Sequence, residues 1–161
     1  MRMRALVAVG LTAGTIAIGA GCTGEPMAPS TAPVSDGSQV SAQRYLADSA
    51  AFAAVVRDFA GRLEHLGPVA RPAGLREAAP DLAAALQRAD ALAERLAGER
   101  LQDARLEAQR ARVAPRAAAV VAAMVEVTTH AAAGEAPQTV AALDRFRAAV
   151  TALGTFADSA P

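Results

Sequence analysis

The chain has 161 residues and no net charge, because 16 arginines balance 16 acidic residues and lysine is absent. A protein that binds nucleic acid concentrates positive charge on one surface, so this balance argues against a nucleic-acid partner. Alanine is the most frequent residue, and aromatic residues make up 3% of the chain. Because alanine is the strongest helix former, the composition predicts an all-α protein with closely packed helices and no wide ligand cavity.

The chain begins like an exported protein. A short basic start with Arg2 and Arg4 precedes an apolar run from Ala5 to Ala20. A positive segment followed by an apolar one with small residues at its end is typical of a secretory signal peptide. The run is shorter than the about 20 residues that a membrane-spanning helix needs. The sequence therefore predicts that residues 1–21 direct export and are then removed.

The small residues Gly19, Ala20 and Gly21 stand directly before Cys22, the single cysteine of the chain. This arrangement resembles the lipobox of bacterial lipoproteins, although Gly19 occupies the position where that family has an aliphatic residue. The resemblance implies cleavage between Gly21 and Cys22, followed by diacylglyceryl and palmitate modification of Cys22. It also implies attachment to the cell membrane on the extracytoplasmic side. The alternative is an ordinary secreted protein that is cleaved after Ala20.

The next segment, residues 22–40, contains Pro26, Pro29 and Pro33 among Ser, Thr and Gly. Such a stretch has too little bulky apolar surface to bury, so it is predicted to be a disordered linker behind the lipidated cysteine. Residues 41–161 are the predicted alanine-rich helical bundle.

Amphipathic helices are predicted after the linker from apolar residues spaced by three and four. The first helix covers residues 41–66, with the stripe Tyr45, Ser49, Phe52, Val56, Phe59, Leu63 and Leu66. The second stripe consists of Leu75, Leu82, Leu86, Ala89, Ala93 and Leu96. Because proline favours the first turn of a helix, Pro80 is the predicted start of this helix and residues 73–79 a separate turn.

The third stripe consists of Val113, Ala117, Val120, Met124, Val127 and Ala131, and it closes at Gly134. Pro137 suits the first turn of a fourth helix, whose stripe is Val140, Leu143, Phe146, Val150, Leu153 and Ala157. Four such helices with short links predict an up-down four-helix bundle. The alternative is a three-helix arrangement with one long central helix.

The position of the break before the third helix depends on Leu96, Leu101 and Leu106. Five residues advance a helix by about 140°, so these leucines cannot share one face of an unbroken helix. A turn at Gly98 resolves this conflict, and the third helix then runs over residues 99–133 with a kink at Pro115. The competing interpretations place the break near Pro115 or keep one helix over residues 80–133.

The two histidines, His65 and His130, each fall in the last turn of a predicted helix, which places both at one pole of an up-down bundle. Glu126 and His130 are four residues apart, a spacing that presents two ligands to one metal ion. His65, Glu126 and His130 are therefore candidate metal ligands. A histidine in a last turn also has an ordinary role, because its charge interacts favourably with the helix dipole.

A segment rich in arginine covers the predicted break and contains Arg95, Arg100, Arg105, Arg110, Arg112 and Arg116. Acidic residues alternate with these arginines, which predicts a solvated helix surface with the pairs Arg100–Asp103 and Glu107–Arg110. The functional alternative is contact with anionic lipid headgroups or with an acidic wall polymer.

No catalytic motif is evident, and the sequence predicts no enzyme and no cofactor. Tyr45, Phe52 and Phe156 are expected to meet in the core at the membrane-proximal pole. The predicted function is a membrane-anchored module that binds an envelope protein or polymer, or that has a structural role. The alternative is a carrier of a small ligand or metal at the pole of His65 and His130.

Overall fold

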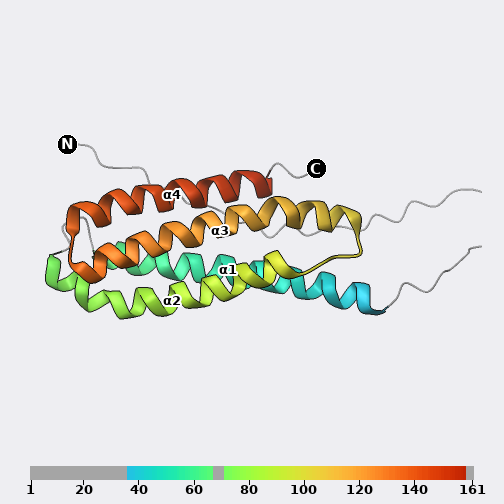
Figure 1. Ribbon diagram of the computed structural model, residues 1–161, viewed down its shortest axis with the longest axis horizontal. Coiled ribbons are helices and arrows are strands. Elements are labelled where there is room, and N and C mark those ends of the chain that lie inside the picture. The colour runs from blue at the N-terminus through green and yellow to red at the C-terminus, as the bar shows by residue number, and fades with distance from the viewer. Residues whose placement is uncertain (1–35, 67–70, 159–161) are drawn as a thin grey trace, which may run out of the picture. The chain divides into compact units, whose positions relative to one another are not determined.

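The computed structural model describes the backbone of residues 36–66 and 71–158, and the side chains of residues 41–66 and 71–154. In these ranges the chain forms four α-helices and no strand (Figure 1). The helices are α1 (Asp36–Leu66), α2 (Pro72–Gly98), α3 (Ala104–Ala133) and α4 (Ala136–Asp158). The predicted all-α four-helix bundle is confirmed, and a three-helix arrangement with one long central helix is not formed.

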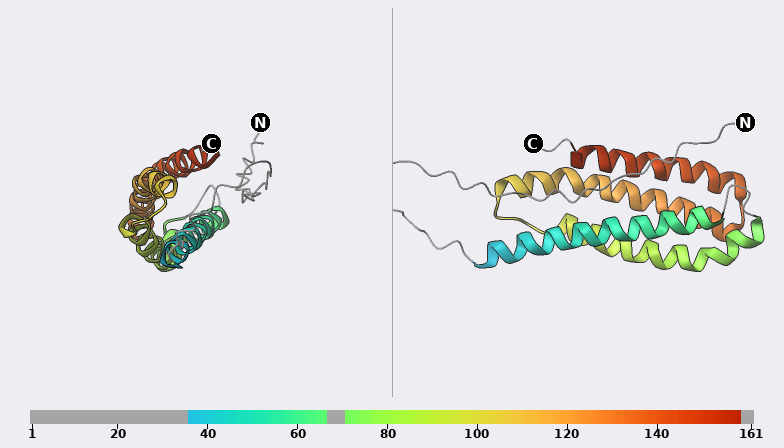
Figure 2. Two further views of the ribbon diagram at one scale, coloured as in Figure 1. Left: turned by 90° about the vertical axis from the view of Figure 1, so that its right-hand side faces the viewer. Right: turned by 180° about the vertical axis from the view of Figure 1, so that it is seen from behind.

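The helices pack in chain order, each antiparallel to the one before it. Close backbone contacts join α1 to α2, α2 to α3 and α3 to α4. Among the described residues, α1 and α4 do not pack in this way, and the helices form an arc when seen end-on (Figure 2, left). The two outer helices meet inside the arc, where the ring centroids of Phe59 and Phe146 are 5.3 Å apart. The bundle is therefore open on the side between α1 and α4.

The core follows the inner side of this arc. Its largest fully buried side chains are Tyr45, Phe59, Phe146, Leu82, Leu96, Met124, Val120 and Val127. Small residues fill the helix crossings, where Ala85, Ala89, Ala117, Ala131 and Ala142 are also completely buried. Alanine at a crossing allows two helix backbones to approach closely, so the alanine-rich composition is used for packing as well as for helix formation.

The predicted stripes match the buried faces of α1, α2 and α3 with few exceptions, whereas the prediction for α4 is wrong in part. Val140 is 53% exposed, while Thr139, Ala142 and Phe146 are the buried residues among the α4 side chains that are described, and Ala157 lies outside them. The reason is its place at the edge of the arc. α4 packs along α3, and Val140 lies at the rim of a shallow depression beside Leu63 and Leu66 of α1, where it stays half exposed.

Helix α1 begins at Asp36, earlier than the predicted start at Ser41, so it includes the last residues of the predicted linker. Pro33 is the last proline before this helix, and the absence of a later proline allows the helix to extend toward the N-terminus.

Helix α2 is continuous from Pro72 to Gly98, so the separate turn predicted for residues 73–79 is wrong. Pro72 occupies the first turn that proline favours. Pro80 lies within the helix on its exposed side, where the carbonyl group that loses its partner is accessible to water. Leu75 and Leu82 are buried on either side of Pro80, and their packing holds the helix across it.

The predicted break at Gly98 is confirmed, and the competing break at Pro115 is not, because α3 continues through Pro115. The helix begins at Ala104, after the N-cap Asp103, whose carboxylate accepts a hydrogen bond of 2.8 Å from the backbone N–H of Leu106. This connection lets Leu96 and Leu101 be buried while Leu106 packs against the core, which resolves the conflict in their spacing.

The link between α3 and α4 consists of Gly134 and Glu135. Gly134 has a φ of 74°, a left-handed conformation that favours glycine. Its N–H bonds the carbonyl of Ala131, and the N–H of Glu135 bonds the carbonyl of His130, both at 2.9 Å. This is the Schellman pattern that ends a helix. A Cβ at position 134 would also lie 2.8 Å from the guanidinium of Arg76, whose flexible side chain would have to shift, so the left-handed φ is the main reason for glycine here.

The burial of Phe52, which is 3% exposed, generates a stability prediction. Phe52→Ala should lower the free energy of unfolding by about 3–5 kcal/mol, because it removes a core ring and leaves a cavity. Leu46→Ala is the matched control on the same helix, since Leu46 is 54% exposed and its truncation should change stability by about 0.5 kcal/mol or less. Urea denaturation measures both, and equal effects would contradict the described core.

Candidate functional site

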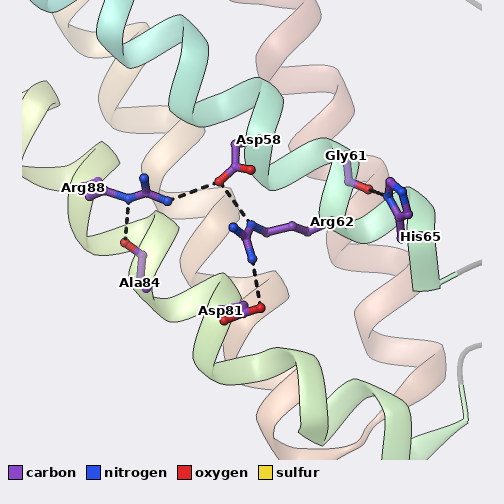
Figure 3. Close-up of polar contacts among 7 residues, drawn as sticks. All are labelled: Asp58, Gly61, Arg62, His65, Asp81, Ala84 and Arg88. Carbon is purple, nitrogen blue, oxygen red and sulfur yellow. Dashed lines mark hydrogen bonds and ion pairs between the residues drawn. The ribbon is translucent and has the colours of Figure 1, made fainter.

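The most extended polar cluster among the described residues joins α1 to α2 (Figure 3). Asp58 Oδ2 accepts hydrogen bonds from Arg62 at 3.1 Å and from Arg88 at 3.2 Å. Arg62 also donates to Asp81 of α2 at 2.9 Å. The carboxylates of this cluster are therefore engaged by guanidinium groups, which link the two helices.

Asp48 and Arg95 continue the same helix pairing nearer the start of α1. Arg95 donates to both carboxylate oxygens of Asp48, at 3.0 and 3.1 Å. The pKa of Asp48 is lowered below its ordinary value, mainly by this hydrogen bonding with Arg95. The pattern indicates a structural role for these charges, because each one completes a contact between neighbouring helices.

A second polar cluster, which we call the Arg110–Glu107 cluster, holds the connection between α2 and α3. Arg110 is 7% exposed, and its guanidinium donates to Glu107 Oε1 at 2.6 Å and to Glu107 Oε2 at 2.8 Å. It also donates to the carbonyl of Ala97 at 2.7 Å and to that of Leu96 at 3.5 Å. Arg110 of α3 thus donates hydrogen bonds to carbonyl groups at the end of α2, which have no partner within their own helix.

Glu107 connects Arg110 to the chain between the helices. Its Oε2 accepts a hydrogen bond of 3.1 Å from the backbone N–H of Leu101, and its Oε1 accepts one of 3.3 Å from Arg100. The pKa of Glu107 is lowered to about 2. The largest cause is the hydrogen bond from Arg110, and the next is the hydrogen bond from the backbone of Leu101. The carboxylate is therefore held in its ionised form.

The predicted pairs of the arginine segment have different outcomes. The pair Glu107–Arg110 is confirmed. The pair Arg100–Asp103 is not formed, because Arg100 reaches Glu107 and Asp103 caps α3. The prediction that Arg110 lies on a solvated surface is wrong. The spacing of Leu106, Arg110 and Val113 by four and three places Arg110 on the apolar stripe, and this signal could have identified it.

Tyr45 of α1 packs near the same cluster and is almost completely buried. Burial raises the pKa of Tyr45, while a hydrogen bond with Ser49 and the positive charge of Arg110 act in the opposite direction. The first half of α1 is thereby placed beside the end of α2. Phe52 is buried on the same helix, as predicted, whereas the side chain of Phe156 lies outside the described residues.

The structure does not bring the candidate metal ligands together. His65 Nδ1 lies 2.6 Å from the carbonyl oxygen of Gly61 in its own helix. His130 Nδ1 lies 2.7 Å from Glu135 Oε2, while Glu126 accepts a hydrogen bond of 2.6 Å from Arg145. In the part of the chain that the structure describes, no three His, Cys, Asp or Glu residues are grouped as metal ligands. Each candidate has a separate contact that stabilises a helix end or a helix pair.

A shallow apolar depression lies at the same pole, on the open side of the bundle. Its walls come from α1, α2 and α4, and they consist of Leu63, Leu66, Leu75, Ala136, Thr139, Val140 and Leu143. Its volume of about 50 Å³ is far below the about 300–1,000 Å³ of a typical small-ligand site. This depression is therefore suited to an inserted side chain and not to a small organic ligand.

No protein-family model matches this chain, and no curated protein or solved structure shows significant similarity to it. Of the helices in the described ranges, none has the length and apolar character needed to cross a membrane. Gly21 and Cys22, the predicted cleavage and lipidation residues, lie outside the described residues. The described residues thus form polar clusters with structural roles and a small apolar depression.

Replacing the buried guanidinium tests the Arg110–Glu107 cluster. Arg110→Met should lower the free energy of unfolding by about 2 kcal/mol, because Glu107 and the carbonyls of Leu96 and Ala97 lose a charged donor. Arg57→Met is the matched control, because Arg57 is exposed and its Nε contacts the carbonyl of Ala53 in its own helix. Thermal and urea unfolding should separate the two variants, and equal stability would show that the cluster is dispensable.

The low pKa of Glu107 predicts a dependence of stability on acid. A carboxyl group with a pKa of about 2 in the folded chain, against 4.5 as its ordinary value, stabilises the fold fully above about pH 4.5. This contribution is lost as the pH falls toward about 2. Glu107→Gln should therefore be less stable than the parent at neutral pH, and the difference should shrink between these two values. Urea denaturation over that range measures it, and a constant difference would contradict the prediction.

Proposed function

We propose that this chain is a bacterial cell-envelope lipoprotein, held on the extracytoplasmic side of the membrane by lipid on Cys22. The observation that carries the proposal is the order of basic start, apolar run and Gly19-Ala20-Gly21-Cys22. Acyl chains contribute about 0.8 kcal/mol for each buried methylene, so two or more would anchor the protein firmly. The helical bundle is the part that this anchor presents to the envelope.

The order of the helices defines two poles of the bundle, and α1 begins at one of them. Residues 23–35 join Cys22 to α1, and a chain of this length spans at most about 50 Å when fully extended. The start of α1 lies at the same pole as the connection between α2 and α3, because neighbouring helices are antiparallel. The Arg110–Glu107 cluster therefore lies at the pole where α1 begins, and His65 and His130 lie at the opposite pole.

We propose a binding or structural role for the bundle itself, with an envelope protein or polymer as partner. The ion pairs of Asp48, Asp58 and Glu107 support this role, because their carboxylates are engaged between structural elements. The small volume of the apolar depression also supports interaction through a surface in preference to uptake of a ligand.

The lipid proposal predicts the mass and the partitioning of the exported protein. Expressed in a bacterium with a lipoprotein pathway, the parent chain should begin at Cys22, carry added acyl mass in intact-mass spectrometry, and enter the detergent phase of a two-phase extraction. Cys22→Ser should lose the acyl mass and remain in the aqueous phase, whereas Ser30→Ala should behave like the parent. A parent chain with an unmodified thiol, or one cleaved after Ala20, would overturn the proposal.

A further inference from the structure

The apolar stripe of α4 is incompletely buried within one copy of the chain. The spacing of Val140, Leu143, Val150 and Leu153 marks one side of this helix as an interior face. In the structure, Val140 is exposed and the other three are only partly buried. Val140 and Leu143 line the shallow depression together with Leu63 and Leu66 of α1, so α1 covers this edge of α4 only in part.

Charged residues lie beside this face in an arrangement that is complementary to itself. Val140, Asp144, Arg147 and Thr151 are all exposed and are spaced by four and three, so they share one line along α4. The side chains of Arg147 and Asp144 are 63% and 69% exposed, and they contact each other at 3.3 Å. When a second copy of the same helix runs in the opposite direction, two opposite charges one turn apart each face the opposite charge of that copy.

From these two observations we propose that α4 pairs with α4 of a second copy of this chain about a twofold axis. An axis that passes between residues 145 and 146 places Asp144 opposite Arg147 of the second copy, and this contact occurs twice. The same axis places Val140 opposite Thr151 of the second copy. Val140 is then covered in both copies, and the charges of Asp144 and Arg147 form a network of two acids and two arginines at the centre of the interface.

Charge complementarity identifies the occupant as a second copy running antiparallel. A parallel pair would place Asp144 beside Asp144 and Arg147 beside Arg147, which repels. An apolar partner of another kind would cover Val140 but would leave the two charges without a new partner. The self-complementary order of the stripe therefore favours the antiparallel homodimer.

The test uses residues 22–161 with Cys22→Ser, which prevents a disulfide between copies and does not depend on lipidation. Sedimentation equilibrium from about 1 µM to about 1 mM covers the range of weak to moderate association. The parent should show a monomer–dimer equilibrium, and Val140→Lys should raise its Kd by about tenfold or more. Leu46→Lys is the matched control, because Leu46 is equally exposed but lies on α1, and it should leave the Kd unchanged.

A charge exchange makes the test specific for the proposed pairing. Asp144→Arg and Arg147→Asp should each weaken association, because like charges then face each other across the axis. An equimolar mixture of these two variants should form heterodimers, and the variant with both changes should regain the parent Kd. Circular dichroism verifies that all variants remain helical. A parent that stays monomeric throughout, or single variants that associate like the parent, would overturn the proposal, as would loss of dimer in Leu46→Lys.

Discussion

The fold depends on a positive charge that is buried at the connection between the two central helices. Removing a guanidinium from water costs several kcal/mol unless hydrogen bonds replace the lost hydration. Arg110 obtains them from Glu107 and from carbonyl groups at the end of α2. Glu107 in turn fixes the connecting chain through Leu101. One pair of side chains therefore ties the end of α2 to the connecting chain and to the first turns of α3.

A similar device operates at the opposite end of the same helix pair. Arg76 of α2 donates a hydrogen bond of 3.0 Å to the carbonyl of Ala133, at the end of α3. Each central helix thus provides an arginine that satisfies the C-terminal end of the other, where carbonyl groups lack partners and the helix dipole favours positive charge. Arginine suits this role better than lysine, because its planar fork reaches several acceptors at once. The helices α2 and α3 form the central pair, and α1 and α4 each attach to one side of it.

Sequence patterns predicted what depends on local spacing and missed what depends on position in the bundle. The stripes of α1, α2 and α3 and the break at Gly98 follow from helix geometry, so they were predictable. The burial of Arg110 was missed because charge was read as exposure, although its spacing placed it on the apolar stripe. The continuity of α2 across Pro80 depends on tertiary packing of Leu75 and Leu82, which overrides a local preference. Val140 was misplaced because no local pattern shows that α4 lies at an open edge. His65 and His130 do lie at one pole, as expected, but they and Glu126 form no common group, because each contacts a different neighbour.

The proposed lipid anchor and the proposed α4 pairing would together constrain how the bundle lies on a membrane. If the bundles stood upright on one bilayer, α4 would run in the same direction in every copy. Asp144 would then face Asp144 of the second copy, and Arg147 would face Arg147. Antiparallel pairing on a single membrane instead requires the helices to lie along its surface, with the twofold axis perpendicular to it. α1 has 31 residues and is therefore about 46 Å long, and the chain between Cys22 and α1 reaches at most about 50 Å. Each copy can then lie flat while its anchor stays in the bilayer, so the length of the linker makes the two proposals compatible.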